Sequence, residues 1–311
     1  MITRTQLRLT TSLRYSWRNI AYSAACASLA VVLLATPPSL VVELPVAVVA
    51  ILGTALAIIL GFKNSSAYDR WWEARKIWGG VVNESRTLTR QALHMHAAAG
   101  HEEAVRKAMP ILVRLQLAWV NALRLQLRRI KEEQAWIDSV HAHLSEDQRV
   151  FLASRTNKVT ALSKLQGELV GGLRRSGAID GFQYMVLDGT LARLTDLQGM
   201  AERIRATPLP RPYEYYTKAF LQVFIFFLPF GIIHTMHASG NAWAVVPVTV
   251  VVAWIFHQLY VFGRVMSNPF ENWQTDVPLD AICTTIAIDL KEALGDSDAP
   301  VPLEPVDGVL M

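Results

Sequence analysis

Two long apolar blocks dominate the pattern of this chain, and a charged stretch separates them. Residues 20–62 contain a single formal charge, Glu43, and residues 219–263 contain none. A helix that crosses a bilayer needs about 20 mostly apolar residues, so each block is long enough for two spans. Lipid cannot satisfy backbone hydrogen bonds, which favours helices despite the strand propensity of Val245–Val252. The pattern therefore predicts two membrane-spanning helical hairpins.

Short interruptions divide each block into two spans. Pro37 and Pro38 split the first block, and His237–Asn241 splits the second. The four expected spans are Ile20–Thr36, Leu40–Phe62, Lys218–Met236 and Ala242–Phe262. Two alternatives are a cleaved signal peptide at the first span and buried helices of a large soluble protein. A second span follows the first within a few residues, and the long uncharged run is unusual for a soluble core, so the four-span hypothesis is preferred.

The basic residues predict how the hairpins are oriented. Four arginines and no acidic residue precede the first span, namely Arg4, Arg8, Arg14 and Arg18. The two hairpin turns carry no Lys or Arg, whereas residues 63–218 contain 24 of them. Because basic residues favour the cytoplasmic side, we expect both termini and the middle on the cytoplasmic side of a plasma (inner) membrane.

The charged middle is expected to form helices. Asn64-Ser65-Ser66 is a candidate helix start, Gly100 a candidate end, and Pro110 suits the first turn of the following helix. Ser145 and Gln148 have the spacing of a capping box. A further helix is expected to end at Gly177, which would be a left-handed C-cap. The last helix of the region is expected over Phe182–Arg205, with an interruption at Gly189.

These elements define an all-α membrane protein with four transmembrane helices and a cytosolic helical bundle. The expected segments are a cytosolic N-terminal segment (1–19), a transmembrane hairpin (20–62), a cytosolic helical region (63–217), a second transmembrane hairpin (218–263), a cytosolic C-terminal segment (264–294) and a tail (295–311). The tail has three prolines and few large side chains, so we expect it to be flexible or laid over a neighbour.

Composition narrows the class of protein further. Hydrophobic residues make up 52% of the chain and charged residues 18%, below the roughly 25% of typical soluble domains. The net charge of +4 would suit nucleic-acid binding, but the topology signal already accounts for the basic residues. The two cysteines, Cys26 and Cys283, give no disulfide framework. We therefore expect no nucleic-acid partner.

Catalytic and metal-binding patterns are sparse in this sequence. The chain has no Gly-rich phosphate loop and no nucleophile elbow. The histidine pairs His94/His96 and His141/His143 are two residues apart, so a helix would point their rings to different sides. His234, His237 and His257 lie near the ends of expected spans, and no proton-transfer role is assigned to them. The expectation is a protein that is not an enzyme and that uses no cofactor and no metal site.

One stripe on the second span stands out. Thr54, Ile58 and Phe62 follow each other at four-residue intervals and share a helix face. If several copies faced a common axis, this stripe would form stacked rings, and apolar rings can gate ions by dewetting. Ordinary helix packing is the alternative explanation. Glu43, near the outer end of the same span, is either an interfacial carboxylate or part of a carboxylate ring at a pore mouth.

A longer motif gives a family resemblance. The run from Gly61 to Arg70 (Gly-Phe-Lys-Asn-Ser-Ser-Ala-Tyr-Asp-Arg), followed by Trp72-Glu73-Ala74-Arg75, Trp78-Gly79 and Glu84 to Gln91, resembles the bacterial branch of the bestrophin family. Weaker matches follow in the same order. They are Glu202-Arg203-Ile204, Thr207-Pro208-Leu209-Pro210, Asn268-Pro269-Phe270 and Asp276-Val277-Pro278-Leu279-Asp280.

The resemblance implies a homopentamer in the lipid bilayer, with one central ion pore. It assigns Thr54, Ile58 and Phe62 to the narrow neck and Phe182 to a second, cytosolic aperture. Thr54 departs from the family's apolar neck by adding a hydroxyl. Eukaryotic members carry an acidic calcium clasp after the fourth span, where this chain offers only Glu271, Asp276 and Asp280, so calcium activation is not expected.

The sequence thus leads to three hypotheses. The first is a pentameric channel for small inorganic ions, with chloride expected from the family. The second is a channel of the same fold that selects monovalent cations, which Glu43 would favour. The third is a membrane-anchored signalling or scaffold protein whose stripe serves packing alone.

Overall fold

The structure is a computed structural model that describes residues 1–2, 9–34 and 44–311, with side chains described from residue 13 onward in the first helix. The chain divides into two compact units. Residues 4–71 and 208–268 form one, which we call the membrane unit. Residues 1–3, 72–207 and 269–311 form the other, which we call the polar unit.

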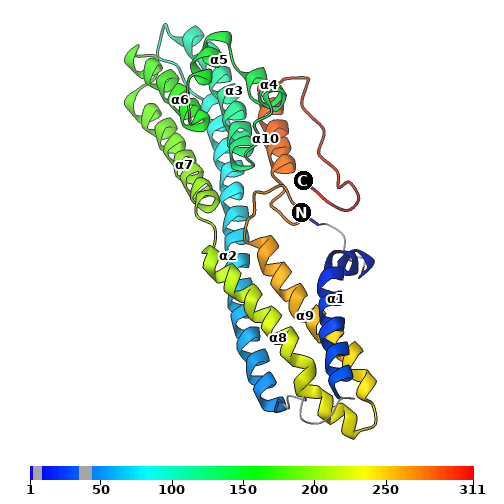
Figure 1. Ribbon diagram of the computed structural model, residues 1–311. Coiled ribbons are helices and arrows are strands. Elements are labelled where there is room, and N and C mark those ends of the chain that lie inside the picture. The colour runs from blue at the N-terminus through cyan, green and yellow to red at the C-terminus, as the bar shows by residue number, and fades with distance from the viewer. Residues whose placement is uncertain (3–8, 35–43) are drawn as a thin grey trace. The chain divides into compact units, whose positions relative to one another are not determined.

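Helices make up nearly all regular structure in the described part of the chain (Figure 1). The long helices of the membrane unit are α1 (Leu9–Leu34), α2 (Val46–Leu93), α8 (Arg211–Ala238) and α9 (Val245–Met266). The polar unit contains α3 (Glu102–Leu127), α4 (Glu133–Ser139), α5 (Glu146–Ala153), α6 (Lys158–Arg175), α7 (Gly181–Ala206) and α10 (Leu279–Leu294), with the second half of α2. Two short 3-10 turns are η2 (His141–His143), which follows α4, and η3 (Ala242–Ala244), which precedes α9.

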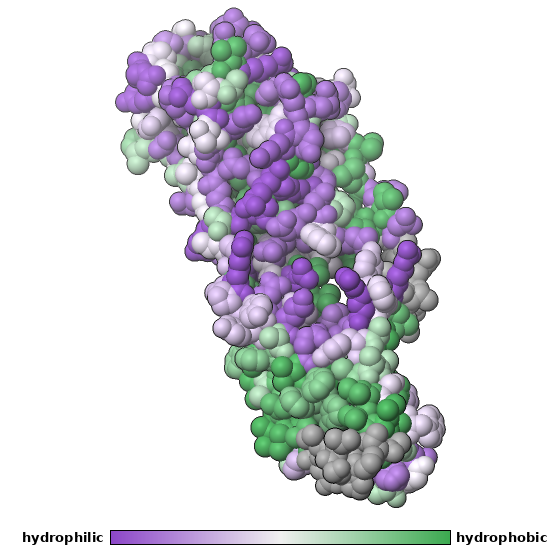
Figure 2. Space-filling model, in the orientation of Figure 1, coloured by the Kyte–Doolittle hydropathy of each residue, from purple (hydrophilic) through white to green (hydrophobic). Residues whose placement is uncertain are grey.

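Among the described residues, four helical stretches are long and apolar enough to cross a membrane: Leu13–Leu34, the apolar part of Val46–Leu93, Arg211–Ala238 and Ala242–Met266. Each overlaps one of the four expected spans, but the bounds differ: the first and third helices begin earlier, the second begins at Val46 rather than at Leu40, and the fourth continues to Met266. Within the membrane unit α1 packs on α9 and α8, and α8 packs on α9. On the face drawn in Figure 2, hydrophobic residues gather over the membrane unit. Such a surface suits lipid rather than water.

Helix α2 corrects one expectation. Asn64-Ser65-Ser66 was expected to start a new helix, yet α2 continues through all three residues to Leu93. Polar residues favour a helix start only where backbone groups need partners, and here packing prevails, because Ala67 just beyond them is fully buried. Pro37 and Pro38, the expected first turn, lie outside the described residues.

The core of the polar unit is built around α3, which contacts α6, α7 and α10. Leu115, Trp119, Leu123 and Leu127, which follow each other at four-residue intervals, are all buried, whereas Ile111 at the start of the same series is exposed. Inside this core Gln116 Nε2 donates to Ser85 Oγ at 2.9 Å, and Gln166 Nε2 donates to Gln116 Oε1 at 2.8 Å. Buried polar groups with such partners avoid the cost of desolvation and fix how the helices pair.

Several helix boundaries test the sequence signals. Ser145 and Gln148 form the expected capping box at α5. Gly177 follows α6 with φ +77°, as a left-handed cap requires. Pro110 was wrongly placed, because α3 already begins at Glu102 and the proline lies inside it. Helix α7 runs through Gly189 without the expected interruption.

The tail 295–311 lies against its own chain. Asp296 pairs with Arg114 of α3 at 3.3 Å, and Asp298 pairs with Lys291 of α10 at 2.6 Å. The Met311 carbonyl accepts a hydrogen bond from the Ala281 N–H at 2.8 Å, and Ile2 pairs with Val309 in a β-bridge. The contacts of the tail are therefore with the helices of its own polar unit.

Candidate functional site

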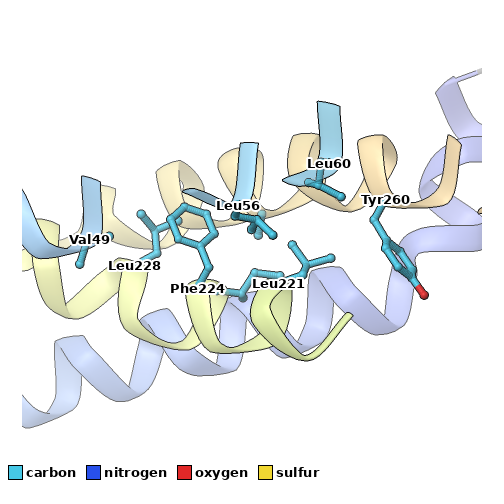
Figure 3. Close-up of a cluster of buried hydrophobic side chains, with 9 residues drawn as sticks. Val49, Leu56, Leu60, Leu221, Phe224, Leu228 and Tyr260 are labelled. Carbon is cyan, nitrogen blue, oxygen red and sulfur yellow. The ribbon is translucent and has the colours of Figure 1, made fainter. Parts of the chain in front are cut away.

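The two faces of α2 in the membrane unit have different surroundings. Val49, Leu56 and Leu60 are buried and form a core with residues of α8 and α9. Figure 3 shows these three side chains directed toward α8, where Leu221, Phe224 and Leu228 meet them. In lipid, such contacts stabilise the helix pair through close packing rather than through transfer of apolar surface out of water. This face of α2 is therefore committed to packing within the chain.

Close approach between α2 and α8 depends on small residues. A Cβ added at Gly231 of α8 would lie 2.5 Å from Val49 Cγ2, and one at Gly53 of α2 would lie 3.0 Å from the Phe224 ring. Real Cβ atoms do not tolerate the first distance, so Gly231 sets how near the helices come. Small residues play this part in membrane helix pairs generally.

The opposite face of α2 carries the stripe that the sequence singled out. Thr54, Ile58 and Phe62 are all exposed on the single chain, with Ile58 at 55% and Phe62 at 69%. The Thr54 hydroxyl donates to the Ala50 carbonyl at 2.9 Å, which leaves its oxygen lone pairs free to accept. The chain thus presents one hydroxyl and two apolar side chains, one helical turn apart, away from its own core.

A lysine, Lys63, directly follows the last residue of the stripe but lies on the buried face of α2. Lys63 follows Phe62, yet it is only 2% exposed, with Nζ 4.1 Å from the Tyr260 ring centroid. Tyr260 OH donates to Glu214 Oε1 at 3.4 Å, and Arg264 Nε lies 3.3 Å from the same oxygen. Sequence reasoning missed Lys63. The signal was its three-residue step from Leu60, which continues the buried face of α2.

Phe182, the candidate residue of the cytosolic aperture, belongs to the polar unit. It is 83% exposed in the first turn of α7, close to the exposed Met185 and Val186. Asp180 caps this helix by accepting from the Gln183 N–H at 2.8 Å, and Gln183 Nε2 donates to the His96 carbonyl at 2.9 Å. The capping box fixes the first turn and so the direction of the Phe182 side chain. Glu43, the candidate outer-mouth residue, lies outside the described residues.

The histidine pairs show no metal-site geometry in the part of the chain that the structure describes, where no group of three or more His, Cys, Asp or Glu could hold a metal ion. Burial, with the charges of Lys291 and Arg114, lowers the pKa of His143 to about 4. Burial also lowers the pKa of His141, helped by Lys158 and Arg149. Both rings are therefore neutral at pH 7.

Two of the three carboxylates of the clasp-like stretch, Glu271 and Asp280, are paired with arginines, whereas Asp276 is not. Glu271 pairs with Arg205. Asp280 Oδ1 and Oδ2 lie 2.5 Å from Arg124 and Arg128; burial alone would raise the pKa of Asp280, but the two arginines outweigh it and lower this pKa. Asp276 is buried, which raises its pKa to about 6, although backbone N–H groups such as that of Trp273 favour its charged form. This arrangement stabilises the loop between α9 and α10.

Comparison with known proteins identifies a family to which this architecture corresponds. The family model described as bacterial/fungal bestrophin protein matches residues 13–292. A voltage-dependent anion channel-forming protein of Mesorhizobium japonicum is 32% identical over 260 residues, which cover 83% of this chain and 77% of the relative. A protein of the same description from Escherichia coli K12 is 31% identical, covering 82% and 79%.

Solved structures agree with these matches. A bacterial bestrophin homologue from Klebsiella pneumoniae has a TM-score of 0.80 and 26% identity, covering 89% of this chain and 98% of that one. A crystal structure described as a membrane protein with one glycine-to-alanine substitution has a TM-score of 0.82, also at 26% identity, covering 90% and 99%. Fold and relatives together define a multi-pass, all-helical membrane protein. The chain belongs to the bestrophin family, in its bacterial and fungal branch.

Proposed function

We propose that this chain is the subunit of a homopentameric ion channel in a bacterial plasma membrane, with both termini in the cytoplasm. Five copies of α2 surround one pore, and Thr54, Ile58 and Phe62 form its neck. The observation that carries the proposal is the two-sided environment of α2. Its buried face is satisfied by α8 and α9, whereas the stripe lies within the broad exposed face of the same helix. Lipid can cover an apolar face of this kind, and the printed description of the relatives as channel-forming is what favours a pore here.

The neck conducts by wetting and dewetting. Rings of isoleucine and phenylalanine hold no bound water when narrow, so ions pass only when the rings widen enough to admit hydrated ions. Thr54, at the outer level, offers hydroxyl oxygens that ease the entry of water. Phe182 forms a second aperture on the cytosolic side. The permeant ions are small inorganic anions, chloride first, in line with the printed description of the relatives as anion channel-forming.

The test is a planar-bilayer recording on purified protein in a potassium chloride gradient. A reversal potential near the chloride limit supports the proposal. One near the potassium limit replaces it with the cation-selective channel, and the next target is then Glu43. Absence of current from intact pentamers that remain closed under voltage and pH changes favours the scaffold hypothesis.

Paired substitutions separate pore lining from packing. Ile58→Ala and Phe62→Ala are expected to raise conductance severalfold without loss of the pentamer. Leu56→Ala, on the buried face of the same helix, serves as the matched control and is expected to lower stability by about 2–5 kcal/mol. If Ile58→Ala and Phe62→Ala abolish assembly instead, the stripe is a packing surface. Size-exclusion chromatography in detergent gives the assembly state of each variant.

A further inference from the structure

Lys63 occupies a position where the helix pattern calls for an apolar residue. The buried face of α2 steps from Leu56 to Leu60, then to Lys63 and on to Ala67, all below 3% exposure. Lysine is rarely buried without a paired charge, and an ionisable group on the buried face of a membrane helix is costly to keep. A residue of this kind calls for a functional explanation.

The surroundings of Lys63 do not neutralise its charge. No described residue accepts a hydrogen bond from Nζ, and the contact that it makes is with the face of the Tyr260 ring. An aromatic face attracts a cation through its quadrupole but carries no net charge. The ring thus holds the ammonium in place without adding a negative charge to the site.

The nearest ionised groups leave the cluster positive. Glu214 and Arg264 act on Lys63 electrostatically. Glu214 is already engaged by Arg264 and by the Tyr260 hydroxyl. Two cations therefore share one carboxylate, and Lys63, Glu214 and Arg264 together carry a net charge of about +1 in their ionised forms. Of the two cations, Lys63 is the buried one.

The position of Lys63 relates this charge to the exposed stripe. Phe62, the last residue of the stripe, immediately precedes it and lies about 100° away around the helix axis, on the exposed face of α2. A charge behind an apolar wall acts through a low-dielectric medium, where its field is weakened far less than in water. Salt screens exposed charges strongly and buried ones much less. The field of Lys63 therefore reaches the face that Phe62 presents.

We propose that Lys63 determines the anion preference of the channel at the inner end of its neck. The inference rests on the proposed function above, since it needs α2 to line a pore. Five buried ammonium groups behind the Phe62 ring attract anions and repel cations, while the apolar ring itself has no charge preference. Lys63 acts through its field and does not contact the permeant ion.

Lys63→Met tests this assignment, because methionine keeps the length and apolar stem of the side chain and removes the charge. Lys218→Met is the matched control, since Lys218 is an exposed lysine of α8 in the same unit. In a potassium chloride gradient, Lys63→Met is expected to lower the chloride-to-potassium permeability ratio about threefold or more. Lys218→Met is expected to leave the ratio unchanged.

A second variant keeps the test independent of how Lys63→Met folds. Glu214→Gln removes the negative member of the cluster at a partly exposed position and is expected to raise the same permeability ratio. An unchanged ratio in assembled Lys63→Met pentamers, or in Glu214→Gln, overturns the role of Lys63 while leaving an anion channel intact. A wild-type protein that conducts no ions or prefers cations overturns the proposed function instead.

Discussion

Gly231 of α8 and Val49 of α2 lie in such close contact that a methyl group on Gly231 would stand 2.5 Å from Val49 Cγ2 and 3.0 Å from Val49 Cβ. Valine is stiff about its first torsion and cannot swing away. Gly231→Ala is therefore expected to push the helices apart and lower stability by about 1–3 kcal/mol. Thermal unfolding in detergent measures the loss.

Gly61 provides the control for Gly231→Ala. It lies on α2, and a Cβ there would meet nothing within 4 Å. Gly61→Ala is expected to leave the unfolding temperature unchanged or to raise it slightly, because alanine favours helix. Equal destabilisation by both substitutions would contradict the close-approach explanation.

Arg128 depends on Asp280. The Arg128 side chain is 2% exposed, and Asp280 lies 2.5 Å from it. Asp280→Asn leaves this buried guanidinium without a counter-charge, so stability is expected to fall by about 3–5 kcal/mol. Asp289→Asn, on the same helix, breaks an exposed pair with Arg86 and is expected to cost less than about 1 kcal/mol. Similar losses from both variants, compared by thermal unfolding, would contradict the assignment.

Asp276 gives stability a pH dependence of the unusual sign. Its pKa is raised by burial from 3.8 to about 6, so the fold favours the protonated form. Protonated Asp276 contributes most to the free energy of unfolding below pH 4, and this contribution is lost as the pH rises to 6. The total difference is at most about 3 kcal/mol. Asp276→Asn is expected to be more stable than the wild type at pH 7 and equal to it near pH 4. Unfolding curves across this range check the expectation, and lower stability of the variant at pH 7 would refute it.

Thr54 is expected to ease the wetting of the outer neck. Because its proton is donated to the Ala50 carbonyl, the oxygen keeps lone pairs that can accept a hydrogen bond from water. Thr54→Val keeps the shape and removes this acceptor, so single-channel conductance is expected to fall about twofold. Thr54→Ser retains the hydroxyl and serves as the control. A valine variant that conducts as well as the wild type would rule out this role.

Calcium is expected to leave the open probability unchanged. Glu271 is engaged by Arg205 and Asp280 by two arginines, so calcium would have to displace guanidinium groups to reach these oxygens. Recording at increasing calcium concentration tests this, and activation at micromolar levels would contradict it.

Much of the membrane unit could be predicted from the sequence, because lipid imposes a simple rule. The uncharged runs correspond to the helices α1, α2, α8 and α9. The stripe Thr54, Ile58 and Phe62 was also visible, since four-residue spacing determines a helix face, and the structure leaves it exposed. Its role in a neck and the aperture at Phe182 stay predictions.

What the sequence did not reveal depends on contacts between distant segments. Asp280 was considered as a calcium ligand, because its arginine partners are more than a hundred residues away on α3 and just beyond it. The continuity of α2 through Asn64 was missed for a similar reason. A Cβ at Gly263 of α9 would lie 2.1 Å from Asn64 Oδ1, so the two helices are in close contact here. This packing, and not a helix cap, determines the place of Asn64.

The polar unit is discontinuous in sequence, and this imposes an order of events during synthesis. Residues 72–207, the larger part of this unit, leave the ribosome before residues 269–311. Both helices of the second hairpin, α8 and α9, are synthesised between these two parts, so they precede α10. At roughly 5–20 residues per second, Asp280 is synthesised about 8–30 seconds after Arg128, because 152 residues separate the two. The α3 surface that later contacts α10 is uncovered during this interval. Insertion of α8 and α9 into the membrane therefore precedes completion of the polar unit, and a delay at that step would leave an unfinished helical core open to aggregation.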